Sequence, residues 1–307
     1  MKHPHLLAWA LSTPWAMRPE SMAAYAMVLA AHYGGRTAMA AALQAHQPQA
    51  GEVQAAAPGS GKRQGGMAII PVMGPIVEWP SQIDMCEGGT STRQIMAALA
   101  DVEADETISS GLMVYSTPGG SVYGVEEVCA VINRVKAKKP IFGVAQSLAA
   151  SAGYWMLSQC SEAYCTPGGE VGSIGVYSGH EDISKALEMA GISIELFSAG
   201  EFKTEGHPFG PMTEEGKNYH RQRALDYYGS FAKGVSKGRN VPIEAVRKGM
   251  GQGRVVGADM ALAEKMIDGI ATMEEVMGKL QRAVRANKPA RSALAAARAD
   301  IDIVAVA

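Results

Sequence analysis

From position 67 onward, short apolar runs alternate with segments of helical spacing, and this alternation limits the fold most. The runs 67–73, 112–116 and 141–145 have the length and composition of strands. The segments between them repeat apolar residues three or four positions apart, as an amphipathic helix does: Ile95, Leu99 and Val102, then Val125, Val128, Ile132 and Val135. Strands that alternate with helices indicate an α/β fold with a largely parallel sheet.

The same criteria extend the pattern toward the C-terminus. They predict a helix over 149–157, strands over 174–177 and 192–197, and a long amphipathic helix from about 213 to 233. Composition divides the rest of the chain, and we expect a helical N-terminal extension (1–50), a Gly/Pro/Ala-rich linker (51–66), one α/β domain (67–286) and a flexible Ala-rich tail (287–307).

Charge and cysteine content exclude several classes of protein. The formal net charge is −2 over 307 residues, so a polycationic surface for nucleic acid is not expected. The four cysteines form no CxxC pair and have no histidine at metal-finger spacing, which favours free thiols in a reducing compartment: Cys86, Cys129, Cys160 and Cys165. The sequence therefore predicts no metal and no cofactor.

The N-terminal region contains two weakly apolar stretches that could be mistaken for membrane segments. The stretch 6–17 is interrupted by Pro14 and followed by Arg18, and no convincing cleavage site appears. The Ala-rich stretch 21–51 carries Arg36 and is too weakly apolar to span a bilayer. We therefore expect a soluble, cytoplasmic protein without a membrane partner.

Two strand-to-helix junctions carry residues suited to chemistry. Gly119 and Gly120 follow the run 112–116, and paired glycines let backbone N–H groups face a ligand. Ser151 lies between Ala and Gly residues after the run 141–145, where a helix N-terminus leaves amides unpaired. Each feature has a simpler explanation, because serine is a common helix cap and Pro-Gly-Gly is a common turn.

A serine nucleophile needs a base, and the residues alone leave three candidates. His180 and His207 lie in the region after the second junction, and each is more simply explained as a surface or loop histidine. Lys203 follows the predicted strand 192–197 and would act as the base of a Ser-Lys dyad. Without further information Lys203 is a solvated surface charge like most lysines.

Four motifs occur in one order that resembles a known family. They are Pro-Gly-Gly-Ser (118–121), Ala-Ser-Ala-Gly-Tyr-Trp (150–155), Thr-Pro (166–167) and Val-Gly-Ser-Ile-Gly-Val (171–176). Together with Gly-Arg-Val (253–255) and Ile-Asp-Gly (267–269), they resemble the signal peptide peptidase A family of serine peptidases. The resemblance implies a fold similar to crotonases and Clp protease subunits, built from repeated β-β-α units, and a homo-oligomer.

The resemblance also implies roles for individual residues. Ser151 matches the nucleophile, Lys203 the general base, and Ser173 the serine that orients the lysine amine. The oxyanion-hole region matches Gly119, Gly120 and the amide of Ala152, where the family commonly has glycine. From these roles we expect Lys203 to be largely desolvated, with Ser151 and Ser173 as its hydrogen-bond partners.

Two segments resemble the phage branch of this family, which includes prohead proteases similar to phage lambda minor capsid protein C. They are 203–213 and the N-terminal Trp-Ala-Met-Arg-Pro-Glu (15–20). The resemblance implies cleavage of scaffold, portal or other head proteins inside an assembling prohead in the host cytoplasm. The alternatives are a bacterial cytoplasmic protease that degrades peptides, an inactive crotonase-like capsid scaffold, and an acyl-CoA-handling crotonase.

Overall fold

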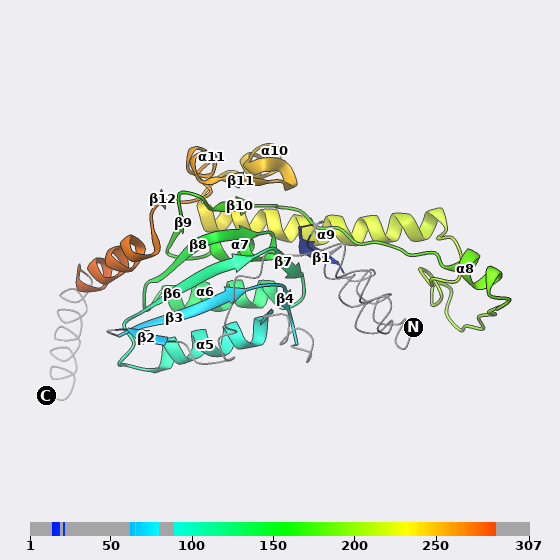
Figure 1. Cartoon of the computed structure of the whole chain (residues 1–307), viewed down its shortest axis with the longest axis horizontal. Coiled ribbons are helices and arrows are strands. Elements are labelled where there is room, and N and C mark those ends of the chain that lie inside the picture. The colour runs from blue at the N-terminus through cyan, green and yellow to red at the C-terminus, as the bar shows by residue number, and fades with distance from the viewer. Residues whose placement is uncertain (1–13, 19–20, 22–61, 65, 80–88, 287–307) are drawn as a thin grey trace, which may run out of the picture.

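The computed structural model describes residues 14–18, 21, 62–64, 66–79 and 89–286, and it shows a mixed α/β protein (Figure 1). Within these residues the larger sheet has eight strands, ordered β11-β10-β8-β6-β3-β2, with β9 beside β8 and β12 beside β9. The run from β10 through β8 and β6 to β3 is parallel. The strand bounds are β2 (Lys62–Gln64), β3 (Met67–Met73), β6 (Ser110–Thr117), β8 (Ile141–Ala150), β9 (Glu162–Cys165), β10 (Glu170–Gly172), β11 (Val255–Gly257) and β12 (Gly269–Ile270).

The central strands β6 and β8 bury both of their faces over 110–115 and 141–145, which is why they appear as continuous apolar runs. Met113 and Tyr115 point to the core under α5 (Thr92–Ala104) and α6 (Val125–Lys136). Leu112 and Val114 point to the opposite face, where they pack with Val276 and Leu280 of the helix 273–286. The two-residue period of a strand therefore divides the core into two layers on opposite faces of one sheet.

A smaller sheet, with four strands among the described residues, lies beside the carboxyl ends of β3 and β6. Its order is β1 (Trp15–Met17), β7 (Gly119–Ser121), β4 (Ile76–Val77) and β5 (Thr90–Ser91). β1 pairs with β7 in the antiparallel direction, although about a hundred residues of chain separate them. The N-terminal segment is thereby brought against the Pro-Gly-Gly motif.

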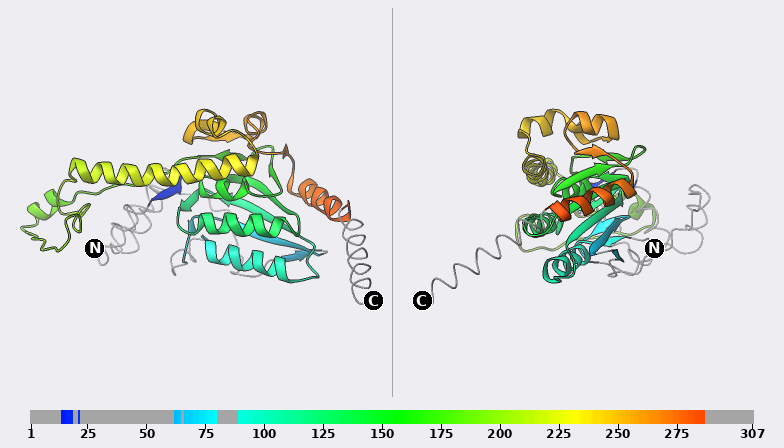
Figure 2. Two further views of the ribbon diagram at one scale, coloured as in Figure 1. Left: turned by 180° about the vertical axis from the view of Figure 1, so that it is seen from behind. Right: turned by 90° about the vertical axis from the view of Figure 1, so that its left-hand side faces the viewer.

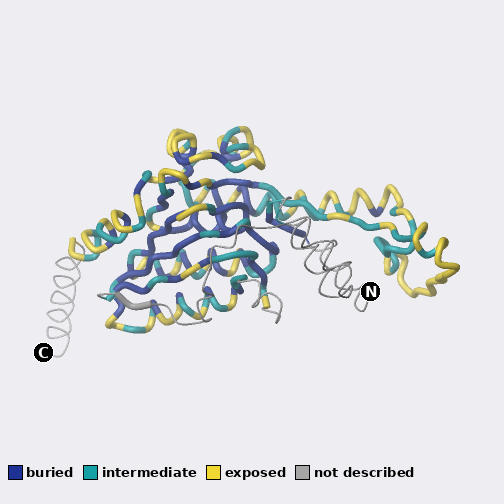
Figure 3. Tube along the Cα trace, in the orientation of Figure 1, coloured by how far each residue is buried: buried dark blue, intermediate teal, exposed yellow. Residues whose placement is uncertain are grey.

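A long helix, α9 (Glu214–Arg239), crosses the domain and extends past the edge of the sheet (Figure 2). Its C-terminal half is anchored by Phe231, which is buried and stacks on Trp155 with ring centroids 4.7 Å apart. Beyond the sheet, the N-terminal half of α9 meets residues 178–212, which we call the arm and which include α8 (Ser184–Met189). Figure 3 shows that the arm is mostly exposed, in contrast to the buried sheet. The remaining elements between α9 and β12 are α10 (Ile243–Lys248), a 3-10 turn over Met250–Gly253 and α11 (Ala258–Ala263).

Most of the predicted elements are confirmed, with three corrections. The predicted helices around 92–102 and 125–135 are α5 and α6, and the apolar residues that predicted them are buried. The predicted strand 174–177 is wrong, because only Tyr177 forms an isolated bridge, and the predicted strand 192–197 is irregular chain on the arm. The helix predicted over 149–157 begins later, as α7 (Ala152–Leu157), because β8 continues to Ala150.

The predicted outer boundaries fall mostly outside the described residues. Of the predicted N-terminal extension only residues 14–18 and 21 are described, and 15–17 form a strand. Of the predicted linker, 62–64 form β2, which pairs with β3. The predicted tail, 287–307, lies outside the described residues entirely.

Candidate active site

Ser151 occupies the junction at which β8 ends and α7 begins. The register of β6 against β8 shifts there, since Tyr115 pairs with Ala145 but Thr117 pairs with Ala149, and such a bulge re-aims the chain that follows it. Ser151 is the N-cap residue of α7, yet its side chain makes no capping hydrogen bond. Its hydroxyl lies 3.4 Å from the carbonyl oxygen of Gly175 instead. The helix-cap explanation of this serine is therefore not what the structure shows.

The backbone of Ser151 is held in an uncommon conformation. Its φ is 54° and its ψ is −116°, a combination that L-residues rarely adopt and that costs of order 1–3 kcal/mol. The N–H of Ser151 donates to the carbonyl oxygen of Gly172 (2.7 Å), which ties the turn to the end of β10. A sharp strand-to-helix turn with a strained serine at its tip is the geometry that presents a nucleophile beside helix-terminal amides.

Gly119 and Ala152 lie at this turn, and Gly120 follows Gly119 in β7. Ala152 is the first residue of α7, where an N–H has no acceptor within the helix. A Cβ on Gly119 would lie 2.9 Å from the Cβ of Ser151, so only glycine permits this approach. The N–H of Gly119 donates to the hydroxyl of Thr117 (3.1 Å), a residue to which sequence reasoning gave no role.

Ser173 reaches the same region from the end of β10. It also has a positive φ of 54°, and its N–H donates to the carbonyl oxygen of Arg254 (2.8 Å). The side chains of Ser151 and Ser173 are both buried, at 0% and 6% exposed, and their residues flank Gly172 in space. The structure thus gathers two serines and the glycine-rich turns at one end of the parallel strands.

Lys203 is not part of this cluster within a single chain. It is exposed and lies in a turn of the arm, where its N–H donates to the carbonyl oxygen of Gly200 (3.2 Å). The expected desolvation of Lys203 against Ser151 and Ser173 is therefore absent from one chain. The physical reason is that the chain leaves the core after Tyr177 and returns only along α9. Lys203 lies between these two points, on the arm that projects outward (Figure 1).

The other two candidate bases make local contacts, and the buried cysteines are poor nucleophiles. His180 and His207 also lie on the arm, where His180 Nε2 is 3.3 Å from the Gly210 carbonyl oxygen and His207 Nδ1 accepts from the Phe209 N–H. Burial raises the pKa of the Cys160 thiol to about 12 and that of Cys165 to about 11. Thiols held in this way stay protonated at neutral pH, which disfavours them as nucleophiles.

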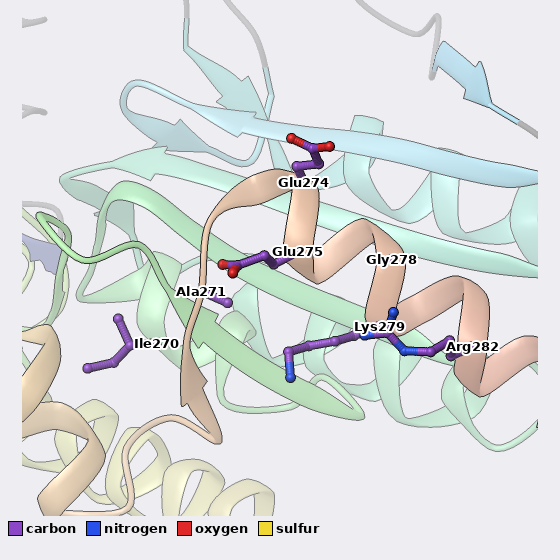
Figure 4. A pocket seen from close by; sticks show the side chains of 7 residues that line it. All are labelled: Ile270, Ala271, Glu274, Glu275, Gly278, Lys279 and Arg282. Carbon is purple, nitrogen blue, oxygen red and sulfur yellow. The ribbon is translucent and has the colours of Figure 1, made fainter.

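A surface hollow of about 510 Å³ lies away from the serine cluster, between β12 and the helix 273–286 (Figure 4). Charged side chains line it, among them Glu275, Lys279 and Arg282, and it holds no residue that the sequence singled out. Glu275 already accepts from the N–H of Thr272 (2.8 Å) at the start of that helix.

In the described part of the chain, no group of three or more His, Cys, Asp or Glu side chains could hold a metal ion. None of the described helices has the length and apolar character that crossing a membrane requires.

Comparisons with known proteins point to a family of peptidases. The model of peptidase family S49 matches residues 133–287, which include Ser151, Ser173 and Lys203. Capsid assembly protease C of Escherichia phage lambda is 27% identical over 79% of the chain and 58% of its own length. The head-tail preconnector protein GP5 of Enterobacteria phage P21 is 29% identical over 79% of the chain and 50% of its own length. A protein named for signal peptide peptidase SppA in Enterococcus faecium is 25% identical over 62% of the chain and 55% of its own length. The chain thus spans between half and three fifths of the length of these relatives.

Proposed function

The chain belongs to peptidase family S49, and on this premise we propose that it is a serine endopeptidase with a dyad of Ser151 and Lys203. The observation that carries the proposal is Ser151 itself, held at a positive φ at the start of α7 with its hydroxyl unused as a helix cap. The crotonase-like and Clp-like architecture implied by the sequence motifs belongs to the same proposal.

The proposed reaction has two stages. The Ser151 oxygen attacks the substrate carbonyl carbon while the amine of Lys203 takes the hydroxyl proton, and that proton passes to the leaving amine as the peptide C–N bond breaks. Water then hydrolyses the resulting ester. Backbone donors from the turns at Gly120 and Ala152 would each contribute about 3 kcal/mol by stabilising the oxyanion.

We infer that the dyad is completed between copies of the chain. Ser151 is enclosed in the core, whereas Lys203 is exposed on an arm that projects past the sheet (Figure 3). An arm that reaches a neighbouring copy would bring its lysine to that copy's serine. Enclosure between copies would also desolvate the amine, which is the usual way in which a lysine becomes a base.

The surface of the arm supports such an association. Several of its large apolar side chains are exposed, and apolar groups gathered in this way mark interaction surfaces. Phe197 is 91% exposed and Met189 is 85% exposed. The other large apolar side chains exposed on the arm are Ile192, Ile194, Leu196 and Phe202. Burying these groups against a second copy gives the free energy that an oligomer needs.

Complementation between two inactive variants tests both the dyad and its division between copies. Ser151→Ala and Lys203→Ala are each expected to lose peptide cleavage. Co-expressed in equal amounts, they form mixed oligomers in which roughly one quarter of the sites combine an intact serine with a neighbour's intact lysine, so about that share of activity returns. Casein-type unstructured protein is a suitable substrate.

A matched lysine on the same arm supplies the control. Lys185 is exposed on α8, and Lys185→Ala should cleave at the wild-type rate. Retained cleavage by either Ser151→Ala or Lys203→Ala removes that residue from the mechanism. Two inactive variants that restore nothing when co-expressed contradict the division of the dyad between copies.

We further propose that the substrates are head proteins of an assembling phage capsid. The support is that the two phage relatives are matched over 79% of this chain, against 62% for the signal peptide peptidase relative. A bacterial peptide-degrading protease is the alternative function. Co-expression with neighbouring head-assembly proteins, followed by mass mapping, distinguishes them, because specific fragments that depend on Ser151 support the capsid role and intact head proteins oppose it.

A further inference from the structure

The strand β1 is buried against the residues that the proposed function assigns to catalysis. Trp15, Ala16 and Met17 are 1%, 0% and 2% exposed. One edge of β1 pairs with β7, and its other edge meets Tyr177, through hydrogen bonds from Trp15 N to Tyr177 O (2.8 Å) and from Tyr177 N to Trp15 O (3.1 Å). β1 therefore fills the slot between the Pro-Gly-Gly strand and the chain that follows Ser173.

Register places the carbonyl of Ala16 at the proposed oxyanion hole. Hydrogen bonds from Val122 N to Pro14 O and from Arg18 N to Pro118 O mark alternate pairs of this antiparallel ladder. Ala16 and Gly120 lie between them and form the next hydrogen-bonded pair, in which each N–H faces the other's carbonyl oxygen. The Gly120 amide that would hold a substrate oxyanion thus faces the carbonyl of Ala16.

The Ala16 carbonyl is also a close neighbour of the nucleophile. A Cβ placed on Gly119 would lie 2.2 Å from Ala16 O and 2.9 Å from the Cβ of Ser151. The Ala16 carbonyl and the Ser151 side chain therefore both lie next to Gly119. The side chain of Ser151 has no exposed surface, so a peptide in solution cannot reach it while these contacts remain.

We propose that β1 occupies the peptide-binding groove of this protein and must leave before a substrate can enter. The proposal rests on the proposed peptidase function. Peptides commonly bind to a domain as an added strand on an exposed sheet edge, and β1 has that relation to β7. The chain thereby places its own residues 14–18 where a substrate would lie.

The position of β1 in the fold allows this displacement. Among the described residues, β1 is the three-residue strand at the end of the small sheet's order, with an isolated bridge to Tyr177 on its other side, so its departure breaks no strand pair of the larger sheet. Its attachment to the same polypeptide gives it a high effective concentration at the groove, which a free peptide at micromolar concentration does not match. Displacement therefore requires weakening of β1 or a competing protein surface.

A reversible cross-link tests the proposal. Trp15 and Ser121 are direct partners in a non-hydrogen-bonded pair, where Cα atoms lie about 4.5 Å apart, within the range that a disulfide spans. Trp15→Cys and Ser121→Cys are introduced into full-length Ser151→Ala protein. Fluorescence anisotropy then measures binding of a fluorescein-labelled peptide with the sequence of residues 13–20.

The reduced protein, in which β1 lacks its tryptophan, should bind the peptide, and the oxidised protein should bind at least about tenfold more weakly because the tether holds β1 in the groove. Trp15→Cys alone should bind equally under both conditions. Equal binding by the double-cysteine protein in both states, including no binding in either, overturns the proposal.

A second variant decides the matter if the double-cysteine chain does not fold. Ala16→Pro removes the N–H that faces Gly120, and in the Ser151→Ala background it should tighten peptide binding by at least about tenfold. Unchanged binding overturns the proposal. Because binding is measured without an intact nucleophile, the result is independent of whether Ser151 cleaves peptides, which hydrolysis by the wild-type protein decides separately.

Discussion

Replacing Gly119 by alanine adds one methyl group inside the proposed site and so tests its close packing directly. The new Cβ would lie 2.2 Å from Ala16 O, 2.9 Å from Ser151 Cβ and 3.0 Å from Ala150 O. Two of these atoms are backbone oxygens and the third is next to the backbone, so no side-chain rotation relieves the contacts. Either β1 or the turn at Ser151 must move.

The expected cost combines two contributions. Gly119 has a φ of +97°, which costs a residue with a Cβ of order 1–3 kcal/mol. Displacement of β1 forfeits ladder hydrogen bonds at about 1 kcal/mol each, together with part of its apolar burial. We expect Gly119→Ala to lower the free energy of unfolding by about 3 kcal/mol, or about 1 M in urea midpoint at a slope near 3 kcal/mol/M.

Urea unfolding followed by circular dichroism measures this change, with Gly168→Ala as the matched control. Gly168 is exposed and a Cβ there would meet nothing within 4 Å, so the same substitution should change stability by less than about 0.5 kcal/mol. If Gly119→Ala unfolds at the same urea concentration as Gly168→Ala, the packing of β1, Gly119 and Ser151 described above is wrong.

Two further predictions concern α9. The pKa of Asp268 is lowered because, although burial raises it, hydrogen bonds from Arg239 (2.8 Å) and the Ala163 N–H (2.7 Å) outweigh that effect. Asp268→Asn should therefore lower the free energy of unfolding by about 1–2 kcal/mol near pH 7, a value discounted for the partial exposure of the carboxylate. This difference from wild type should vanish as the pH falls below the ordinary aspartate pKa near ~4 and then through the lowered folded-state pKa. Urea titrations from pH 7 to pH 3 measure the difference, and one that stays constant with pH contradicts the ion pair. Gly229 lies in α9 with nothing near its Cβ position, so Gly229→Ala should raise the free energy of unfolding by about 0.5–1 kcal/mol. Gly234→Ala should lower the free energy of unfolding, because the new Cβ would lie 2.4 Å from Trp155 Nε1. Equal effects of the two substitutions in urea unfolding would refute this packing of α9.

The core was predictable because the local patterns and the tertiary contacts agree there. The helical spacing in 92–104 and 125–136 matches the buried faces of α5 and α6. The junction at Ser151 was also predictable, since a parallel strand that runs into a helix places its small residues at one end of the sheet. The position of Ser151 thus follows from its own neighbours in the sequence.

The arm and β1 were not predictable, because local pattern and tertiary environment disagree in both. Ile192, Ile194 and Leu196 alternate with polar residues as in a half-buried strand, yet in a single chain they remain 40–52% exposed and unpaired with a sheet. Their apolar character is explained by a partner that a single sequence does not identify. β1 is a strand that shows no pattern, because three residues are too few to reveal the two-residue period of a strand. Its role depends on pairing with β7, about a hundred positions away.

Both of these features, the arm and β1, bear on the proposed dyad of Ser151 and Lys203. The serine is buried and strained within one chain, near that chain's own β1, while the lysine is exposed and distant on the arm. On the proposals above, an isolated chain would therefore lack both an open groove and a base. Activity would begin only when association delivers Lys203 from a neighbour and β1 yields its place to a substrate. A peptidase built in this way would stay inactive as a free chain and cleave only where copies are concentrated, which is the condition that an assembling capsid would provide.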